Sequence, residues 1–121
     1  MAFPAPAVVT EHTDDALVVS VSAGGLATAT ELYGELEEAV GAGERRVVVD
    51  LAAAPPLDLE VVGVLLASLR RLNDVDGSLV LLAPAGEPLA VTGDTVPLHD
   101  FFRVEHSLPA AIAATAVGVG S

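Results

Sequence analysis

Two runs of aliphatic residues, 45–51 ("RRVVVDL") and 78–84 ("SLVLLAP"), constrain the fold more than any other feature of this sequence. Each run places apolar residues at consecutive positions, as strands do when both faces of their sheet are covered. Between them, residues 59–72 repeat leucine and valine at helical spacing. A strand, a helix and a second strand in this order predict parallel strands joined by a crossover helix.

The segments before this unit predict a hairpin followed by a first helix. Residues 7–12 and 16–23 are short and rich in β-branched side chains, and the turn-forming "TDD" between them predicts a hairpin. Residues 30–43 carry apolar side chains at every fourth position, as an amphipathic helix does. The expected landmarks of this helix are the apolar residues Leu32, Leu36 and Val40, a cap at Thr28 or Thr30, and an end at Gly41 or Gly43.

The segments after this unit predict one further strand between two helices. Residues 86–96 are typical of a short, weak helix, and residues 101–105 of a last strand. Residues 107–116 predict the last helix, with Ser107 as its cap and Pro109 in its first turn. This alternation predicts a single α/β domain with a mixed, mostly parallel sheet of about five strands, flanked by about four helices.

The expected domain spans residues 7–116, with a flexible lead-in over 1–6 and a flexible tail over 117–121. Hydrophobic residues make up 52% of the 121 residues, which is enough for one packed core. Aromatic residues make up only 3%, so Val, Leu and Ala must build that core. Such a composition also offers few platforms on which nucleic-acid bases can stack.

The formal net charge of −12, from 17 acidic and 5 basic residues, restricts the partners of the chain. A phosphate backbone or an anionic membrane surface would be repelled, so we expect neither nucleic acid nor membrane as a partner. A protein with a basic patch is the electrostatically favoured partner. Without cysteine, a secretory signal or a run of about 18 apolar residues, the chain is expected to be cytoplasmic.

No residue pattern in the sequence predicts catalysis or metal binding. The three histidines, His12, His99 and His106, fall in different predicted segments and lack the spacing of metal ligands. No Ser-His-Asp arrangement has sequence support, and the Gly-rich segments lack the lysine of a phosphate-binding loop. We therefore expect no enzymatic activity, no metal and no cofactor.

The loop and helix start in "PPLDLEVVG", residues 55–63, hold the candidate site. Asp58 is placed to cap the helix, and Glu60 then takes the second helical position, where the helix dipole favours an anion by roughly 0.3–1 kcal/mol. Stabilisation of the helix start explains both carboxylates, unless they also serve recognition. The apolar side of this helix is expected to comprise Leu59, Val62, Leu65, Leu66, Leu69 and Leu72.

The other side of the same helix is unusually flat. It carries Glu60, Gly63, Val64, Ala67, Arg70 and Arg71. Glycine inside a helix costs about 1 kcal/mol relative to alanine, so Gly63 needs a reason. Either the small residues let a partner approach closely, or Gly63 packs against a neighbouring strand.

Three stretches give the chain a resemblance to a known family. They are "VVVDLAAAPPLDLEVVGVLL", "RRLNDVDGSLVLLAP" and "LHDFFRVEHSLPAAIAA". In this order they resemble the STAS domain, the fold shared by anti-sigma factor antagonists and the cytoplasmic ends of sulfate transporters. The resemblance covers nearly the whole chain and implies the α/β fold predicted above.

The resemblance is weakest at the phosphorylation motif. STAS antagonists typically carry "D-S-S-G" there, and the anti-sigma kinase phosphorylates the second serine. Asp58 matches that Asp, but Leu59, Glu60 and Val61 replace the two serines and the glycine, and Gly25 replaces an Asp before the first helix. Glutamate carries −1 where phosphoserine carries about −1.5 to −2. Glu60 is therefore a fixed phospho-mimic, a charge left after the switch was lost, or part of a domain that never switches.

The resemblance implies a non-enzymatic regulatory protein-binding module similar to an anti-sigma factor antagonist, with an anti-sigma factor kinase as candidate partner. The expected partner-binding residues are Asp58, Leu59, Glu60, Gly63, Ala67 and Arg70. Two alternatives stay open: a structural or scaffold domain in a larger assembly, and a carrier of a small apolar ligand held under the helix of 86–96. Association of the chain with itself as a homodimer also stays open.

Overall fold

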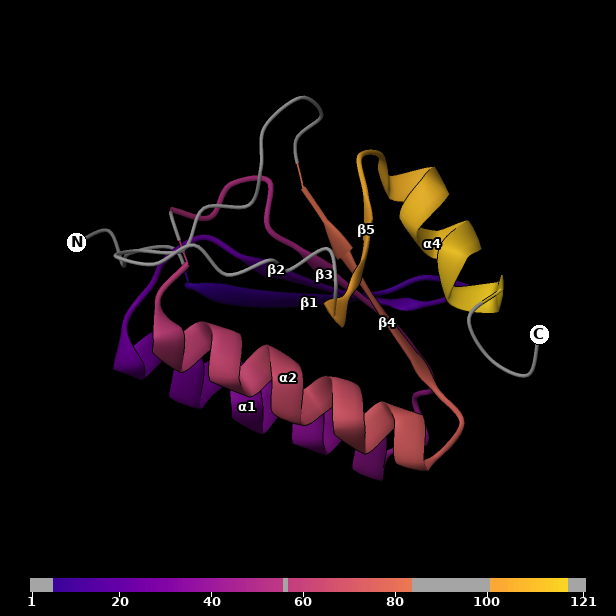
Figure 1. Ribbon diagram of the computed structural model, residues 1–121, viewed down its shortest axis with the longest axis horizontal. Helices are drawn as coiled ribbons and strands as arrows, with labels where there is room; N and C mark the ends of the chain where they lie inside the picture. The colour runs from indigo at the N-terminus through magenta and orange to yellow at the C-terminus, as the bar shows by residue number, and fades with distance from the viewer. Residues whose placement is uncertain (1–5, 56, 84–100, 118–121) are drawn as a thin grey trace.

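The computed structural model describes residues 6–55, 57–83 and 101–117 (Figure 1). The elements within these ranges are β1 (Val8–His12), β2 (Leu17–Val21), α1 (Leu26–Gly41), β3 (Arg46–Asp50), α2 (Leu59–Asp74), β4 (Ser78–Leu82), β5 (Arg103–Glu105) and α4 (Leu108–Val117). The helix predicted over 86–96 lies outside the described residues.

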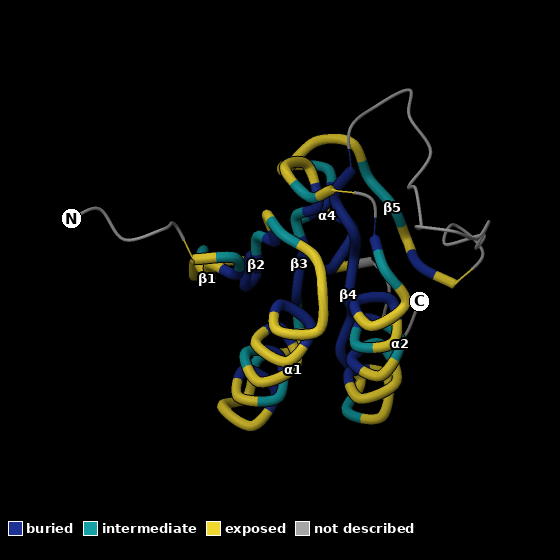
Figure 2. Tube along the Cα trace, turned by 90° about the vertical axis from the view of Figure 1, so that its left-hand side faces the viewer, coloured by how far each residue is buried: buried dark blue, intermediate teal, exposed yellow. Residues whose placement is uncertain are grey.

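The five strands form one sheet in the order β1-β2-β3-β4-β5. β1 and β2 are antiparallel, and the other neighbouring pairs are parallel. Helices α1 and α2 cover one face of the sheet, and α4 covers the other (Figures 1 and 2). The predicted mixed, mostly parallel five-stranded α/β fold is confirmed, with three helices in the described residues against about four expected.

The two central strands show why their apolar runs are continuous. In β3, Val47 and Val49 face the cluster under α1 and α2, whereas Val48 belongs to the cluster under α4. In β4, Leu79 and Leu81 face α1 and α2 in the same way, and Val80 faces α4. Because helices cover both faces, each apolar residue of these strands is buried whichever way it points.

The start of α1 corrects one prediction. The helix begins at Leu26, with Gly25 as its N-cap and no side-chain cap, so neither Thr28 nor Thr30 caps it. Thr28 is buried in the first turn, and the Thr30 hydroxyl donates to the Leu26 carbonyl oxygen at 2.9 Å. The missing local cap is supplied from a distant part of the chain, as described below. The predicted end is confirmed, since Gly41 closes the helix and Gly43 follows with φ +101°.

The buried side of α2 corrects a second prediction. Leu59 was expected among the apolar contacts, but 57% of it is exposed. The buried residues of the helix are Val61, Val62, Leu65, Ser68 and Leu72. The spacing of 61, 65, 68 and 72 defines the stripe, and Leu59 points more than a quarter turn away from it. Ser68 is buried but polar, so a search for hydrophobic spacing does not count it and misplaces the buried side of the helix.

The C-terminal part follows its prediction closely. The last strand is shorter than expected, because Phe101 and Phe102 precede β5. Helix α4 begins after Ser107, whose hydroxyl oxygen accepts from the Ala110 N–H at 3.3 Å and so caps the helix as predicted. Pro109 lies in the first turn, where it removes no intrahelical hydrogen bond.

Candidate protein-binding site

Asp58 joins the starts of the two helices that lie on the same face of the sheet. Its Oδ1 accepts from the Val61 N–H at 3.0 Å, which makes it the side-chain cap of α2. Its Oδ2 accepts from the N–H of Gly25, the residue before α1, across 33 positions of sequence. Helices α1 and α2 follow the parallel neighbours β2 and β3, so both begin at the same edge of the sheet. One carboxylate therefore satisfies backbone donors at both helix starts.

The glycines before α1 make this bond geometrically feasible. Gly25 has φ +94°, in the left-handed region that side chains disfavour. A Cβ on Gly24 would lie 2.9 Å from Asp58 Oδ2, which is too close. The Gly-Gly pair thus lets the backbone approach the carboxylate.

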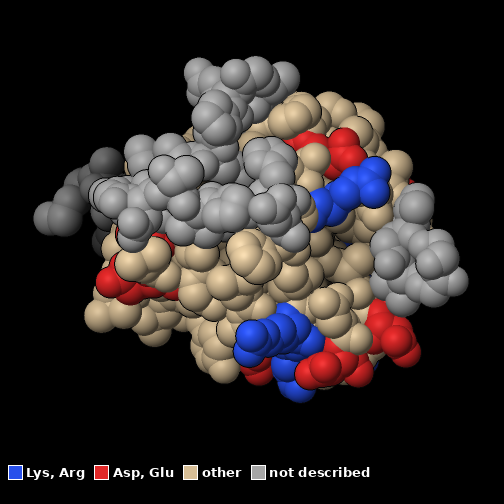
Figure 3. All heavy atoms as spheres, in the orientation of Figure 1, with Lys and Arg blue, Asp and Glu red and all other residues tan. Residues whose placement is uncertain are grey.

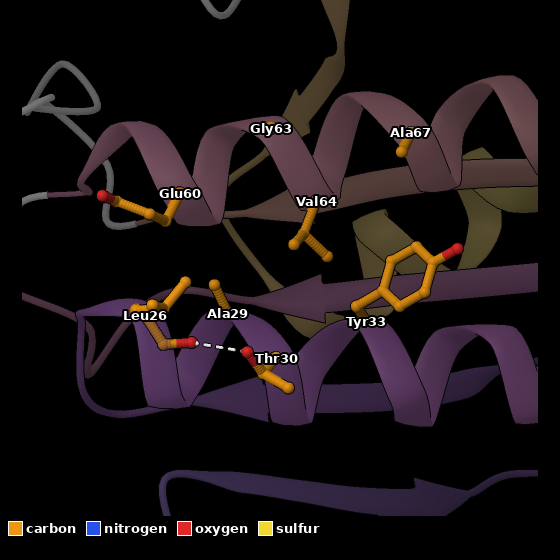
Figure 4. Close-up of a pocket in the computed structure, with 8 residues that line it drawn as sticks. All are labelled: Leu26, Ala29, Thr30, Tyr33, Glu60, Gly63, Val64 and Ala67. Atoms are coloured by element: carbon orange, nitrogen blue, oxygen red, sulfur yellow. Dashed lines mark hydrogen bonds between the residues drawn. The ribbon is translucent and has the colours of Figure 1, made fainter.

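A groove of about 420 Å³ lies between α1 and α2 (Figure 4). It is lined by Leu26, Ala29, Thr30, Tyr33, Glu60, Gly63, Val64 and Ala67. The Val64 side chain points from α2 into the space between the helices, and Ala29 and Tyr33 reach into it from α1. The Thr30 hydroxyl is bonded to the backbone of its own helix, so the lining is mostly apolar.

Two contacts link the helices, one near their N-terminal ends and one near their C-terminal ends. The bond from Gly25 to Asp58 links their N-terminal ends. Nearer their C-terminal ends, Arg71 Nε lies 3.6 Å from Glu37 Oε1. That ion pair is partly exposed and contributes little free energy by itself, yet it leaves both charges matched across the helices.

Large apolar side chains are exposed around the groove. Leu26 and Leu59 are the first residues of α1 and α2, and they are 70% and 57% exposed. Tyr33, on the groove wall, is 47% exposed. An apolar patch left open in this way is a mark of an interaction surface.

The six predicted site residues divide into two groups. Asp58 is half-buried, and both of its oxygens accept hydrogen bonds within the chain. The exposed ones are Leu59, Glu60, Gly63, Ala67 and Arg70. Glu60, Gly63 and Ala67 line the groove, whereas Arg70 does not.

The surroundings of Gly63 decide between the two explanations offered for it. Helix α1 also contributes residues to the site that the sequence prediction did not include. A Cβ on Gly63 would meet no atom of the described residues within 4 Å, so packing against any of the five described strands is wrong. Leu26 and Tyr33 of α1 were not predicted as site residues. Together with Ala29 they lie at i, i+3 and i+7, which makes a second apolar row on that helix. This row is the feature of the sequence that could have identified them as site residues.

The charges of α2 lie at its start and in its last two turns, with none between Glu60 and Arg70. Figure 3 shows acidic side chains at the left of this face and, lower on the face, basic side chains with further acidic ones beside them. In the sequence, the charged residues of α2 and its cap are Asp58 and Glu60, then Arg70, Arg71 and Asp74. The site is thus acidic at the end where the two helices begin.

The described histidines make isolated contacts. His12 Nδ1 lies 3.4 Å from Glu44 Oε1, and His106 Nδ1 lies 3.1 Å from the Ala83 carbonyl oxygen. Among residues 6–55, 57–83 and 101–117, no three potential ligands gather as a metal site would require. No helix within the same ranges is long and apolar enough to cross a membrane. His99 and the ligand pocket considered under 86–96 lie outside the described residues.

Comparison with known proteins gives one family and several related structures. The sequence family described as "Mlab, STAS domain" matches residues 8–102. An anti-sigma factor antagonist from Mycobacterium paratuberculosis superposes with a TM-score of 0.72 and 25% identity, covering 90% of this chain and 92% of that one. No curated protein sequence matches the chain.

Two further structures share the fold at lower identity. The anti-sigma factor antagonist SpoIIAA in its unphosphorylated form gives a TM-score of 0.66 at 15% identity, over 93% of this chain and all of that one. A putative anti-sigma factor antagonist from Thermotoga maritima gives 0.74 at 13% identity, over 90% and 94%. With the sequence match running from β1 to Phe102 and the same sheet and helices in place, the chain belongs to the STAS domain family.

Proposed function

We propose that this STAS domain is a non-enzymatic regulatory protein-binding module of the anti-sigma factor antagonist type, acting in the cytoplasm. Its partner binds at the start of α2 and along the adjoining groove. The likeness to the mycobacterial antagonist, at 25% identity over 90% of the chain, supports the class of function. The charge of −12 supports a partner with a basic surface.

The observation that carries the proposal is the arrangement of Asp58, Leu59 and Glu60. Asp58 is engaged by Val61 and Gly25, so it holds the loop rather than a partner. Leu59 and Glu60 are exposed and free to make contacts. A helix start that is capped by Asp58 and presents one apolar and one acidic side chain is suited to recognition.

Glu60 gives this surface a permanent charge. Residues 55–63 contain no Ser, Thr or Tyr, so a kinase that phosphorylates hydroxyl side chains has no acceptor in this loop. Two outcomes are open for the charge. As a mimic of phosphoserine it weakens binding to an anti-sigma kinase, and as a direct contact with a partner arginine it strengthens binding by roughly 1–3 kcal/mol.

Binding measurements separate these cases. A pull-down from native lysate, followed by mass spectrometry, identifies the partner, and calorimetry then compares the wild type with Glu60→Ser and Glu60→Ala. Glu31→Ala is the matched control, since Glu31 is also exposed but does not line the groove. Tighter binding on loss of Glu60 supports mimicry, and weaker binding supports a contact. An unchanged affinity contradicts both. Recovery of a large assembly or of the chain itself, with no sigma regulator, would favour the scaffold function instead.

A further inference from the structure

The groove between α1 and α2 runs along about two turns of each helix. The helices run side by side in the same direction and are linked on either side of the groove by the Asp58 and Arg71 bridges. Leu26 and Tyr33, which bound one wall, are seven positions apart, about 10 Å along the axis, or two turns. The opposite wall is shallow at Gly63 and Ala67, because glycine has no side chain and alanine has only a methyl group.

The walls of the groove favour a helix over an extended peptide. An extended peptide needs backbone donors and acceptors from the surface that binds it, as at the edge of a sheet. Here both walls are the first halves of helices, and beyond the first turn their backbone groups are already paired within each helix. A bound helix satisfies its own backbone bonds and needs only apolar contact, and the bare Gly63 lets its backbone approach closely.

The charges that line the groove favour a basic occupant over an acidic one. Glu60 lines the end where the two helices begin, while Arg71 and Glu37 balance each other towards the opposite end. A second copy of this chain would bring another charge of −12 to an acidic surface, which is unfavourable. A cationic residue near one end of the occupant would instead pair with Glu60.

From shape, backbone pairing and charge we infer that the groove binds an amphipathic helix of the protein partner. This helix places apolar side chains at i, i+4 and i+7 against Leu26, Tyr33 and Val64, and a Lys or Arg against Glu60. The inference rests on the proposed function, because it names the element of the partner that this surface recognises. It also makes α1 half of the binding surface.

A displayed library of random peptides, roughly 14 residues or four turns long, tests the inference on the intact chain. Selected peptides are expected to show the helical apolar spacing with a basic residue near one end. Gly63→Leu fills the groove and should weaken these peptides at least about tenfold. Gly34→Leu is the matched control, since Gly34 is also an exposed helical glycine where an added Cβ meets no described atom within 4 Å, yet it lies outside the groove. It should bind as the wild type does.

Charge reversal supplies the second arm. Glu60→Lys should weaken the selected peptides about tenfold, and a peptide with its basic residue changed to Glu should recover binding to that variant. Circular dichroism confirms that each variant is folded. Selected peptides without helical spacing, equal loss for Gly34→Leu and Gly63→Leu, or no recovery on charge reversal would overturn the inference.

The two proposals fail in distinguishable ways. If a sigma regulator from the pull-down binds tightly and responds to Glu60 but ignores Gly63→Leu, the helix inference is wrong and the proposed function stands. If peptides bind in the groove as expected but no sigma regulator is recovered, the groove is a helix-binding site with another kind of partner.

Discussion

Helices α1 and α2 are equal in length, cover the same face of the sheet and start at the same edge, yet their first turns are built differently. Helix α2 has its own cap in Asp58 and an acidic residue, Glu60, in its first turn. Helix α1 has Gly25 as its N-cap, no side-chain cap and no acidic residue in its first turn. The N–H of Gly25, just before α1, donates to Asp58, 33 positions further along the chain.

This difference makes one helix start dependent on the other. The cap of α2 is local, so it forms as soon as the helix does. The bond to Gly25 requires that β2, β3 and both helices are already in place, because it joins two separate loops. The exposed Leu26 and Leu59 flank this bond and therefore keep their positions relative to each other through it.

Replacing Asp58 should give the largest effect on stability. Asp58→Ala removes the cap of α2 and the acceptor for Gly25, and is expected to lower the free energy of unfolding by about 2 kcal/mol. Asp58→Asn keeps one amide oxygen to cap α2 but turns an NH₂ group towards the Gly25 N–H, donor against donor. Chemical denaturation measures the stability of both variants, and amide exchange reports each helix start separately.

The asparagine variant decides whether the two helix starts are coupled as described. We expect faster exchange at Gly25 and little change at Val61. Equal protection of Gly25 in Asp58→Asn and the wild type would show that α1 does not depend on this carboxylate.

Substitutions of the helical glycines test whether either glycine has a structural role in its helix. Gly34 in α1 and Gly63 in α2 are both exposed, and a Cβ on either meets no atom within 4 Å in the part of the chain that the structure describes. Gly34→Ala and Gly63→Ala should each raise the free energy of unfolding by up to about 1 kcal/mol. Thermal denaturation measures the gain. If only Gly63→Ala fails to stabilise the fold, Gly63 has a structural role that its open surroundings do not reveal.

The sequence predicted the sheet well because the signals for it are local. The runs in β3 and β4, the turn between β1 and β2, and the caps Asp58 and Ser107 each lie within a few residues of what they determine. Hydrophobic spacing and capping chemistry act at that range. These elements were therefore placed almost to the residue.

The errors arise where distant parts of the chain meet. The first turn of α1 was missed because its hydrogen-bond acceptor belongs to a loop that follows another strand. Leu59 was assigned to the wrong side because the buried stripe of α2 includes Ser68, which a hydrophobic pattern does not count. Leu26 and Tyr33 were missed because only the packing of α1 beside α2 makes them part of a groove. The role of Glu60 in binding and the domain limits at residues 7 and 116 stay predictions.

The smallest expected effect comes from exchanging the second residues of the two helices. Ala27 in α1 occupies the position that Glu60 occupies in α2. A carboxylate in a first turn interacts favourably with the helix dipole by about 0.3–1 kcal/mol. We therefore expect Ala27→Glu to stabilise the chain and Glu60→Ala to destabilise it by similar small amounts, both measured by urea denaturation at low salt.

Salt and the double variant show whether this difference is electrostatic. At about 1 M salt the screening length falls to about 3 Å, so both shifts should shrink together. The variant carrying both changes keeps the net charge of −12 and should unfold near the wild-type midpoint. A loss with Glu60→Ala that persists in salt would mean that the Glu60 side chain stabilises α2 by contact rather than by charge. A loss in Ala27→Glu would mean that the first turn of α1, already held by the Asp58 carboxylate, repels a second negative charge. That last result would itself be evidence that the bond between Asp58 and Gly25 sets the electrostatics of both helix starts.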